Sequence, residues 1–239
     1  MIRSIYNELL AHFDKIYIIT LSDEKERHTA IKNTLNKIGY YPHPKFEFFV
    51  TTPFPYNSLI MEAFNVSGRG KFIYPNEYDC ARSHYNLVKR SYDKGLNNVL
   101  IIEDDMLFNS DVDMWVDMLE NMPKDYDVIQ FYWLRNHPKV NQLIKQNKRY
   151  IKHDELGLWS TACYTLSKKG MKYYIDSMDD FFTVADYPLY NAVDTDLNCY
   201  IPTKPMVKLN THKSRIRTKT NTDINDIYYK DEMKNIEWV

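Results

Sequence analysis

The amino-acid sequence predicts an α/β domain whose central sheet is mostly parallel and is flanked by helices. Strand-like and helix-like segments alternate along the 239 residues, which is the pattern of βα units. Residues 99–102 form a continuous run of valine, leucine and isoleucine, as a central strand covered by helices on both faces requires. Glu103, Asp104 and Asp105 follow at once. Because ligands of open α/β sheets bind beyond the carboxyl ends of strands, this acidic run marks the expected site.

The other elements are predicted from hydrophobic periodicity. Short apolar or alternating runs indicate strands, and apolar residues at helical spacing indicate helices. Asp23 with Glu26, Ser110 and Ser167 are the expected helix starts, and Gly39 and Gly95 the expected ends. The predicted strands are residues 15–21, 46–50, 127–133 and 159–166, and the predicted helices begin near residues 23, 76, 110 and 167.

The whole chain, residues 1–239, is expected to form one domain. No repeat, low-complexity tract or linker interrupts it. Residues 135–155 are predicted to be a loop, and residues 220–239 a polar tail.

Composition excludes some functions. The chain has 31 Lys and Arg against 32 Asp and Glu, so no global positive field indicates nucleic acid binding. No apolar run approaches the roughly 20 residues that span a bilayer, and the apolar run at residues 16–19 is too short for a signal core. A cytoplasmic location is therefore expected. Cys80, Cys163 and Cys199 are widely spaced and are expected to be free thiols.

Three adjacent carboxylates at a strand end repel one another. Burial would raise their pKa values unless a cation keeps them ionised. A divalent ion that bridges them to a diphosphate is the simplest explanation, and a solvated turn is the alternative.

The segment Tyr78-Asp79-Cys80-Ala81-Arg82-Ser83-His84, followed by Gly95 and residues 99–105, resembles the core signature of glycosyltransferase family 25. This family includes bacterial lipooligosaccharide galactosyltransferases. The spacing fits one helix plus one strand. Residues 16–27, 162–171 and 205–216 also resemble family segments in the same order. Two positions depart from the pattern, because Thr20 replaces the usual Asn and Asp79 replaces a Gly.

The resemblance implies a GT-A (Rossmann-like) fold and transfer of a hexose from a UDP-sugar, with galactose the first candidate. The acceptor would be a surface glycan such as lipooligosaccharide. The implied cofactor is Mn²⁺ or Mg²⁺. Asp105 is the expected direct ligand, and Asp104 is expected close by, on the ribose or the metal. The side chains of Glu103 and Asp105 could point the same way along an extended segment. Glu103 could then bind the metal directly or support a residue that does. His212 is a further candidate ligand.

Several residues are candidate contacts of the donor nucleotide, and each has a structural alternative. Arg27 could meet the phosphates or be a solvated helix charge. His84 could contact the donor or be satisfied by local hydrogen bonds, and Ser83 could simply pack. The basic segment 204–219 could close over the diphosphate, contact an anionic membrane peripherally, or be an exposed face. The donor-binding candidates are Thr20, Arg27, Ser83, His84, Asp104, Lys213 and Arg215.

Inverting transfer needs a carboxylate that takes the proton of the acceptor hydroxyl. Asp186 is the first candidate, because its segment at residues 185–188 resembles the family's acidic position downstream of the helix that begins near residue 167, and Asp194 and Asp196 come next. Each could instead cap a turn. The aromatic residues Tyr132, Trp133 and Trp159 could stack on sugar or uracil, or pack in the core.

Two other functions stay open. A metal-dependent phosphohydrolase also uses clustered carboxylates, although it usually needs ligands from more motifs. A catalytically idle nucleotide-sugar or glycan-binding domain is the second alternative.

Overall fold

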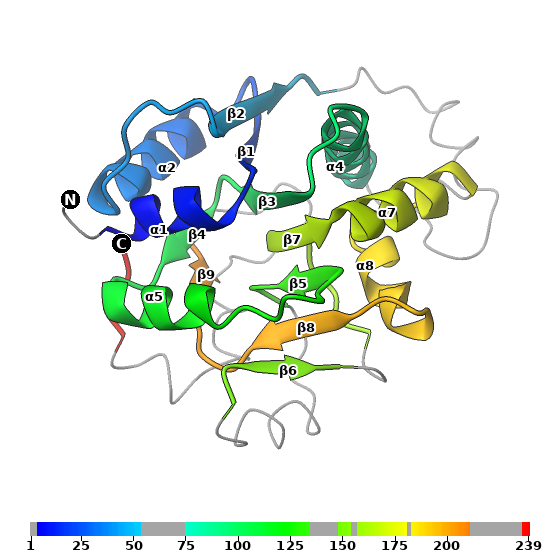
Figure 1. Cartoon of the computed structure of the whole chain (residues 1–239). Helices are drawn as coiled ribbons and strands as arrows, with labels where there is room; N and C mark the ends of the chain where they lie inside the picture. The colour runs from blue at the N-terminus through cyan, green and yellow to red at the C-terminus, as the bar shows by residue number, and fades with distance from the viewer. Residues whose placement is uncertain (1–3, 54–74, 134–147, 154–156, 181–182, 211–235) are drawn as a thin grey trace.

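The computed structural model describes residues 4–53, 75–133, 148–153, 157–180, 183–210 and 236–239. Its centre is a seven-stranded sheet with the strand order β2-β1-β3-β7-β5-β8-β6 (Figure 1). A second sheet pairs β4 with β9. The strands are β1 (Lys15–Leu21), β2 (Phe46–Thr51), β3 (Asn98–Glu103), β4 (Met106–Phe108), β5 (Val128–Gln130), β6 (Tyr150–Lys152), β7 (Cys163–Ser167), β8 (Cys199–Pro202) and β9 (Val207–Leu209).

The central sheet is mostly parallel, as predicted. β1 pairs in parallel with both β2 and β3, and β5 pairs in parallel with β8. β7 runs antiparallel to β3 and β5, and β6 runs antiparallel to β8. With β6 and β7 reversed, the other five of the seven strands share one direction.

Helices lie on both faces of the large sheet (Figure 1). This explains the continuous apolar run of β3, because its side chains alternate between two hydrophobic clusters. Leu100 and Ile102 pack in one cluster, and Val99 and Ile101 pack in the other. The helices are α1 (Ile5–His12), α2 (Lys25–Lys37), α4 (Pro75–Asp93), α5 (Val112–Glu120), α7 (Lys168–Asp180), α8 (Tyr187–Asn191) and the short 3₁₀ helix η1 (Ala192–Asp194).

The structure corrects several element boundaries. α1 was not predicted, and β6 lies within the predicted loop 135–155. The strand expected over residues 127–133 is only Val128–Gln130, and the strand expected over 159–166 begins at Cys163. Short strands and strands next to irregular segments carry little periodicity, so their ends are not legible in sequence.

Helix caps were predicted with mixed success. Glu24 rather than Asp23 precedes α2 and makes no side-chain cap, so the expected capping box is wrong. Asp111 rather than Ser110 caps α5, because its side chain accepts the Met114 N–H. The two glycine stops are confirmed, since Gly39 and Gly95 have φ angles of +92° and +72°, the left-handed conformation typical of helix ends. None of the helices in the described ranges has the length and apolar character needed to cross a membrane.

Candidate active site

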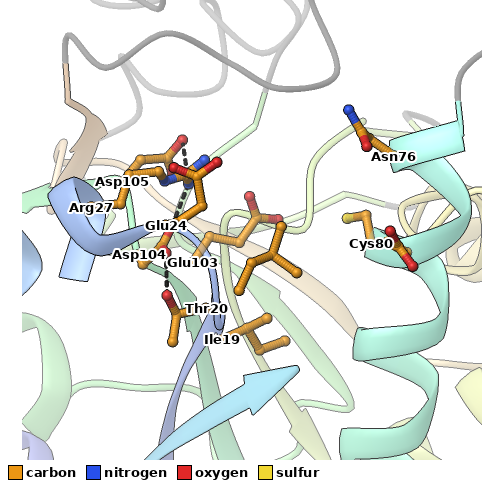
Figure 2. Close-up of a pocket in the computed structure, with 11 residues that line it drawn as sticks. Ile19, Thr20, Glu24, Arg27, Asn76, Cys80, Glu103, Asp104 and Asp105 are labelled. Atoms are coloured by element: carbon orange, nitrogen blue, oxygen red, sulfur yellow. Dashed lines mark hydrogen bonds and ion pairs between the residues drawn. The ribbon is translucent and has the colours of Figure 1, made fainter. Parts of the chain in front are cut away.

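A cavity opens at the carboxyl ends of β1 and β3, between the start of α2 and the start of α4 (Figure 2). The acidic run that follows β3 therefore lies at a hollow, at the sheet edge where the sequence placed it. The lining residues come from four segments and are Ile19, Thr20, Leu21, Glu24, Arg27, Asn76, Asp79, Cys80, Glu103, Asp104 and Asp105.

Asp104 and Asp105 both face Arg27 of α2. The guanidinium forms an ion pair with Oδ1 of Asp104 and lies 3.0 Å from Oδ2 of Asp105. The hydroxyl of Thr20, near the end of β1, donates a hydrogen bond of 2.5 Å to Oδ2 of Asp104. Figure 2 shows this group on one wall of the cavity. Arg27, Thr20 and Asp104, all predicted as donor contacts, are thus brought together.

The charges of this group are strongly coupled. Burial raises the pKa of Asp104, although Arg27 and the Thr20 hydroxyl act in the opposite direction. Burial would lower the pKa of Arg27, but attraction to Asp105 and Asp104 outweighs it and raises the value. The cation that the sequence requires beside the carboxylates is therefore partly supplied by the chain itself. The alternative of Arg27 as a solvated helix charge is wrong, because its side chain is only 14% exposed.

Glu103 has different partners from its two acidic neighbours. Its Oε1 accepts a hydrogen bond of 2.9 Å from Thr161 and lies 3.3 Å from Nε2 of His84. Burial alone would raise the pKa of Glu103, but His84 and Thr161 lower it below its ordinary value. The expectation that Glu103 and Asp105 alternate along one extended segment is wrong, since β3 ends at Glu103 and a turn begins at Asp104.

His84 and Ser83 lie behind the cavity rather than among its described lining residues. His84 is only 1% exposed, and its Nδ1 is 2.9 Å from the Tyr164 hydroxyl. The Ser83 hydroxyl donates to the Asp79 carbonyl and lies 2.9 Å from the hydroxyl of Thr51 on β2. Ser83 therefore joins α4 to β2, which agrees with its packing alternative, and donor binding by either residue stays a prediction.

The candidate bases lie in different settings. Asp186 is half-buried at the start of α8. Burial raises the pKa of the Cys80 thiol, and the charges of Glu103 and Asp186 raise it further. Asp194 is exposed at the end of η1. Asp196 pairs with Lys169 at 2.9 Å on the surface. Of the three candidates, Asp186 is the one that is half-buried and whose charge acts on Cys80, a residue of the cavity lining.

Tyr132 and Trp133 are each only 3% exposed, which confirms the core-packing alternative for both. Trp159 is half-buried and stacks on Tyr190, with ring centroids 4.3 Å apart. Its ring also lies 6.4 Å from that of Tyr187, the neighbour of Asp186 in the chain. Trp159 therefore stays a candidate for stacking on a sugar.

His212, Lys213 and Arg215 lie outside the described residues, as does most of the basic segment 204–219. Their predicted roles stay predictions.

Sequence reasoning missed five polar residues of this region: Glu24, Asn76, Asp79, Cys80 and Thr161. A usable signal exists for α4. Residues 76, 80 and 84 follow each other at intervals of four, which places them on one helix face. No comparable pattern identifies Thr161. It lies in irregular backbone just before β7, and it contacts Glu103 because β7 pairs with β3 in the sheet.

The chemistry of the donor set fits a hard divalent ion. Asp104 and Asp105 present carboxylate oxygens at one wall of the cavity, and such oxygens are the ligands that Mg²⁺ and Mn²⁺ prefer. Asp105 is the better candidate ligand, because both oxygens of Asp104 are already held by Thr20 and Arg27.

Comparison with known proteins identifies the family. The family model described as glycosyltransferase family 25 (LPS biosynthesis protein) matches residues 13–189, or 177 of the 239 residues. The chain belongs to glycosyltransferase family 25. The α/β fold with its mostly parallel sheet is therefore the GT-A-like fold that the resemblance implied.

One curated relative of this family 25 chain is the lacto-N-neotetraose biosynthesis glycosyltransferase LgtE of Neisseria meningitidis serogroup B (strain ATCC BAA-335 / MC58). It is 22% identical over 187 residues, which cover 74% of this chain and 64% of LgtE. The chain thus matches slightly less than two thirds of the relative's length.

Two solved structures show weaker similarity to the family 25 chain. The inositol-1-phosphate CTP transferase from T. maritima is 14% identical, with a TM-score of 0.41 and coverage of 80% of this chain and 85% of that one. The galactosyltransferase LgtC, in complex with donor and acceptor sugar analogues, is 11% identical, with a TM-score of 0.38 and coverage of 74% and 69%.

Proposed function

We propose that this family 25 chain transfers a hexose, with galactose as the first candidate, from a UDP-sugar to a surface glycan such as lipooligosaccharide. The observation that carries the proposal is the pair Asp104 and Asp105, which lines a cavity at the carboxyl ends of β1 and β3 next to Arg27. The name of the relative LgtE, a glycosyltransferase of lacto-N-neotetraose biosynthesis, supports a glycan acceptor.

The cavity wall would bind the diphosphate of the donor. A Mn²⁺ or Mg²⁺ ion held by Asp105, with Asp104 beside it, would neutralise the charge that develops on the leaving diphosphate. Thr20 would fix the orientation of Asp104 through its 2.5 Å hydrogen bond. Arg27 would place a permanent positive charge at the same wall, where the charged side chains are at most 14% exposed and electrostatic stabilisation is stronger than in water.

The acceptor would approach from the side of α8. With inversion, Asp186 would take the proton of the acceptor hydroxyl as that oxygen attacks the sugar carbon. Trp159 and Tyr187, whose ring centroids are 6.4 Å apart, would supply aromatic surface for a sugar ring beside this carboxylate.

Other features of the proposal concern residues outside the described ranges or the setting of the chain in the cell. We propose that the basic segment 204–219 closes over the diphosphate, with His212 as a further ligand. We further propose that residues 1–239 form a single domain. The chain would be cytoplasmic and would contact the inner face of the membrane peripherally.

Calorimetric titration of nucleoside diphosphates tests the donor site. We expect UDP to bind in the presence of Mn²⁺ and to lose binding when a chelator is added. Asp105→Asn should abolish the Mn²⁺-dependent component, because it removes a negative ligand from the cavity wall. Asp93→Asn is the matched control, since that carboxylate is exposed and pairs only with Lys89 at 3.6 Å in the described structure.

The outcomes separate the alternatives. UDP binding that requires Mn²⁺ would support the transferase, and turnover of UDP-galactose within a panel of UDP-sugars would then identify the donor. If UDP binding is unchanged by the chelator and by Asp105→Asn, the assignment of Asp105 as a metal ligand is contradicted. A folded chain that binds no nucleotide would favour the phosphohydrolase or the idle domain.

A further inference from the structure

The wall of the cavity opposite Arg27 carries a second group of potential ligands with different chemistry. Cys80, His84 and Glu103 each offer one ligand atom, and these atoms lie within 4.8 Å of one another. Two of the three residues, Cys80 and Glu103, also line the cavity. Figure 2 shows Cys80 on α4, across the cavity from Asp104 and Arg27.

The backbone arranges this group without strain. Cys80 and His84 are four residues apart in α4 and therefore lie on one face of the helix. Glu103 is the last residue of β3, and its carboxylate reaches His84 rather than the Arg27 group. One helix and one strand end thus bring a sulfur, a nitrogen and an oxygen donor to the same place.

The surroundings hold two of these donors in position. His84 is 1% exposed and its Nδ1 lies 2.9 Å from the Tyr164 hydroxyl, while Nε2 makes no hydrogen bond to the described residues and faces Glu103 at 3.3 Å. Thr161 donates to Glu103. Partners of this kind on the far side of a ligand fix the ring orientation and the tautomer of metal-binding histidines.

We propose that Cys80, His84 and Glu103 form a site for a zinc-class divalent ion, distinct from the oxygen site at Asp105. Sulfur, imidazole and carboxylate together suit Zn²⁺ rather than Mg²⁺ or Mn²⁺. Around tetrahedral zinc a nitrogen and an oxygen ligand lie roughly 3.3 Å apart, and a sulfur lies roughly 3.5 Å from either, as follows from the metal–ligand distances. The His84–Glu103 separation of 3.3 Å already matches, and the Cys80 sulfur, within 4.8 Å of both other ligand atoms, needs to approach them by roughly 1.3 Å at most.

Binding would convert the Cys80 thiol to a thiolate, and its proton would go to solvent. The fourth position of the ion would face the cavity, because Cys80 and Glu103 line it whereas His84 closes the site from behind. The ion would tie α4 to the end of β3 and would place a positive charge on the wall opposite Arg27.

Titration of the full chain with Co²⁺, followed by absorption, tests the site. Cobalt bound by a thiolate gives a near-ultraviolet charge-transfer band, which an all-oxygen site such as Asp105 lacks. We expect this band to saturate at one ion per chain and to disappear in Cys80→Ser and in His84→Gln. Cys199→Ser is the thiol control and should keep it, since Cys199 lies in β8. Absence of the band in the folded chain, or its survival in Cys80→Ser, would overturn the proposal.

Two measurements keep the test decisive if a variant folds poorly. In the unmodified chain, Zn²⁺ should protect Cys80 from alkylation, as read by mass spectrometry, and unchanged reactivity would count against the site. Tyr164→Phe removes only the hydroxyl next to His84 and should weaken Co²⁺ binding about 10- to 100-fold, the usual effect of losing such a partner. Unchanged affinity in Tyr164→Phe would contradict the positioning of His84.

The zinc-class site and the transferase proposal can fail separately. Asp105→Asn should keep the thiolate–cobalt band while losing Mn²⁺-dependent UDP binding. If the unmodified chain binds no UDP but the band is present and depends on Cys80, the proposed function fails and the zinc-class site stands. If UDP binding behaves as expected and no band forms, the site is wrong and the proposed function is unaffected. Loss of the band in Asp105→Asn would also refute a separate site.

Discussion

At the scale of single residues, Arg27 supplies the positive charge that balances the buried carboxylates Asp104 and Asp105. Its guanidinium contacts both Asp104 and Asp105, and all three side chains are at most 14% exposed. Two carboxylates buried side by side without a cation would repel each other and would also lose hydration. The arginine is therefore as much a part of the cavity wall as the carboxylates are.

We predict that Arg27→Met lowers the free energy of unfolding by about 3 kcal/mol in the presence of a chelator, because it leaves buried carboxylates unpaired. Mn²⁺ should restore part of this loss by replacing the missing positive charge. Denaturant unfolding with and without Mn²⁺ measures both effects. Arg90→Met is the control, since Arg90 is 40% exposed and pairs with Glu47. Arg90→Met should lower the free energy of unfolding by about 1 kcal/mol or less, and Mn²⁺ should not change this loss. Equal behaviour of the two variants would refute the coupling.

The general base is also a question of single residues. We predict that Asp186→Asn lowers kcat by about 10²- to 10⁴-fold, the usual contribution of a positioned base, with little change in Mn²⁺-dependent UDP binding. Asp194→Asn should retain activity, because Asp194 is exposed at the end of η1. Steady-state kinetics with the best UDP-sugar tests both variants. The reverse ranking would move the base to Asp194.

At the scale of elements, two glycines are required for different reasons. Gly170 lies in α7, where a Cβ atom would collide with the backbone oxygen of Asp127. Gly95 lies after α4 with a φ angle of +72° and nothing within 4 Å of its Cβ position. Packing thus demands the first glycine, and backbone conformation demands the second.

We predict that Gly170→Ala destabilises the fold by roughly 1–3 kcal/mol, the typical cost of overpacking where backbone must move. Gly95→Ala should cost about 1 kcal/mol, because only the left-handed conformation is penalised. Thermal and denaturant unfolding compare the two substitutions directly. A larger loss for Gly95→Ala would mean that α7 can shift away from residue 127 at little cost.

At the scale of the whole molecule, residues 236–239 brace the strand that follows the acidic run. The N–H of Val239 donates to the carbonyl of Phe108 at 2.9 Å, and the Phe108 N–H donates back at 2.8 Å. The Lys208 ammonium of β9 lies 4.7 Å from the centre of the Trp238 ring. β4 begins at Met106, immediately after Asp105, so this pairing connects distant segments of the chain next to the cavity.

We predict that deletion of residues 236–239 lowers the free energy of unfolding by about 3 kcal/mol, since three backbone hydrogen bonds to Phe108 and Ser110 at about 1 kcal/mol each are lost. Mn²⁺-dependent UDP binding should weaken as well, because β4 anchors the turn at Asp104 and Asp105. Glu237→Gln keeps the backbone pairing and should change stability by no more than about 0.5 kcal/mol. Full stability and UDP binding in the truncated chain would show that this brace has no effect on the site.

The sequence by itself determined the α/β class, the strand at residues 15–21, the central strand and the carboxylates that end it. These features rest on local patterns, because a strand buried on both faces needs continuous apolar side chains. The family block from Tyr78 to His84 is likewise a local signal, and it led to family 25.

Only the tertiary structure decided how the acidic run divides. The strand ends at Glu103, so this carboxylate meets His84 and Thr161, while the turn after it directs Asp104 and Asp105 to Arg27. Apart from the His84–Glu103 contact, these contacts join residues far apart in the chain, as the Thr161–Glu103 and Thr20–Asp104 hydrogen bonds show with separations of 58 and 84 positions. Contacts over such separations depend on strand order and helix placement, and no periodicity in the chain encodes them.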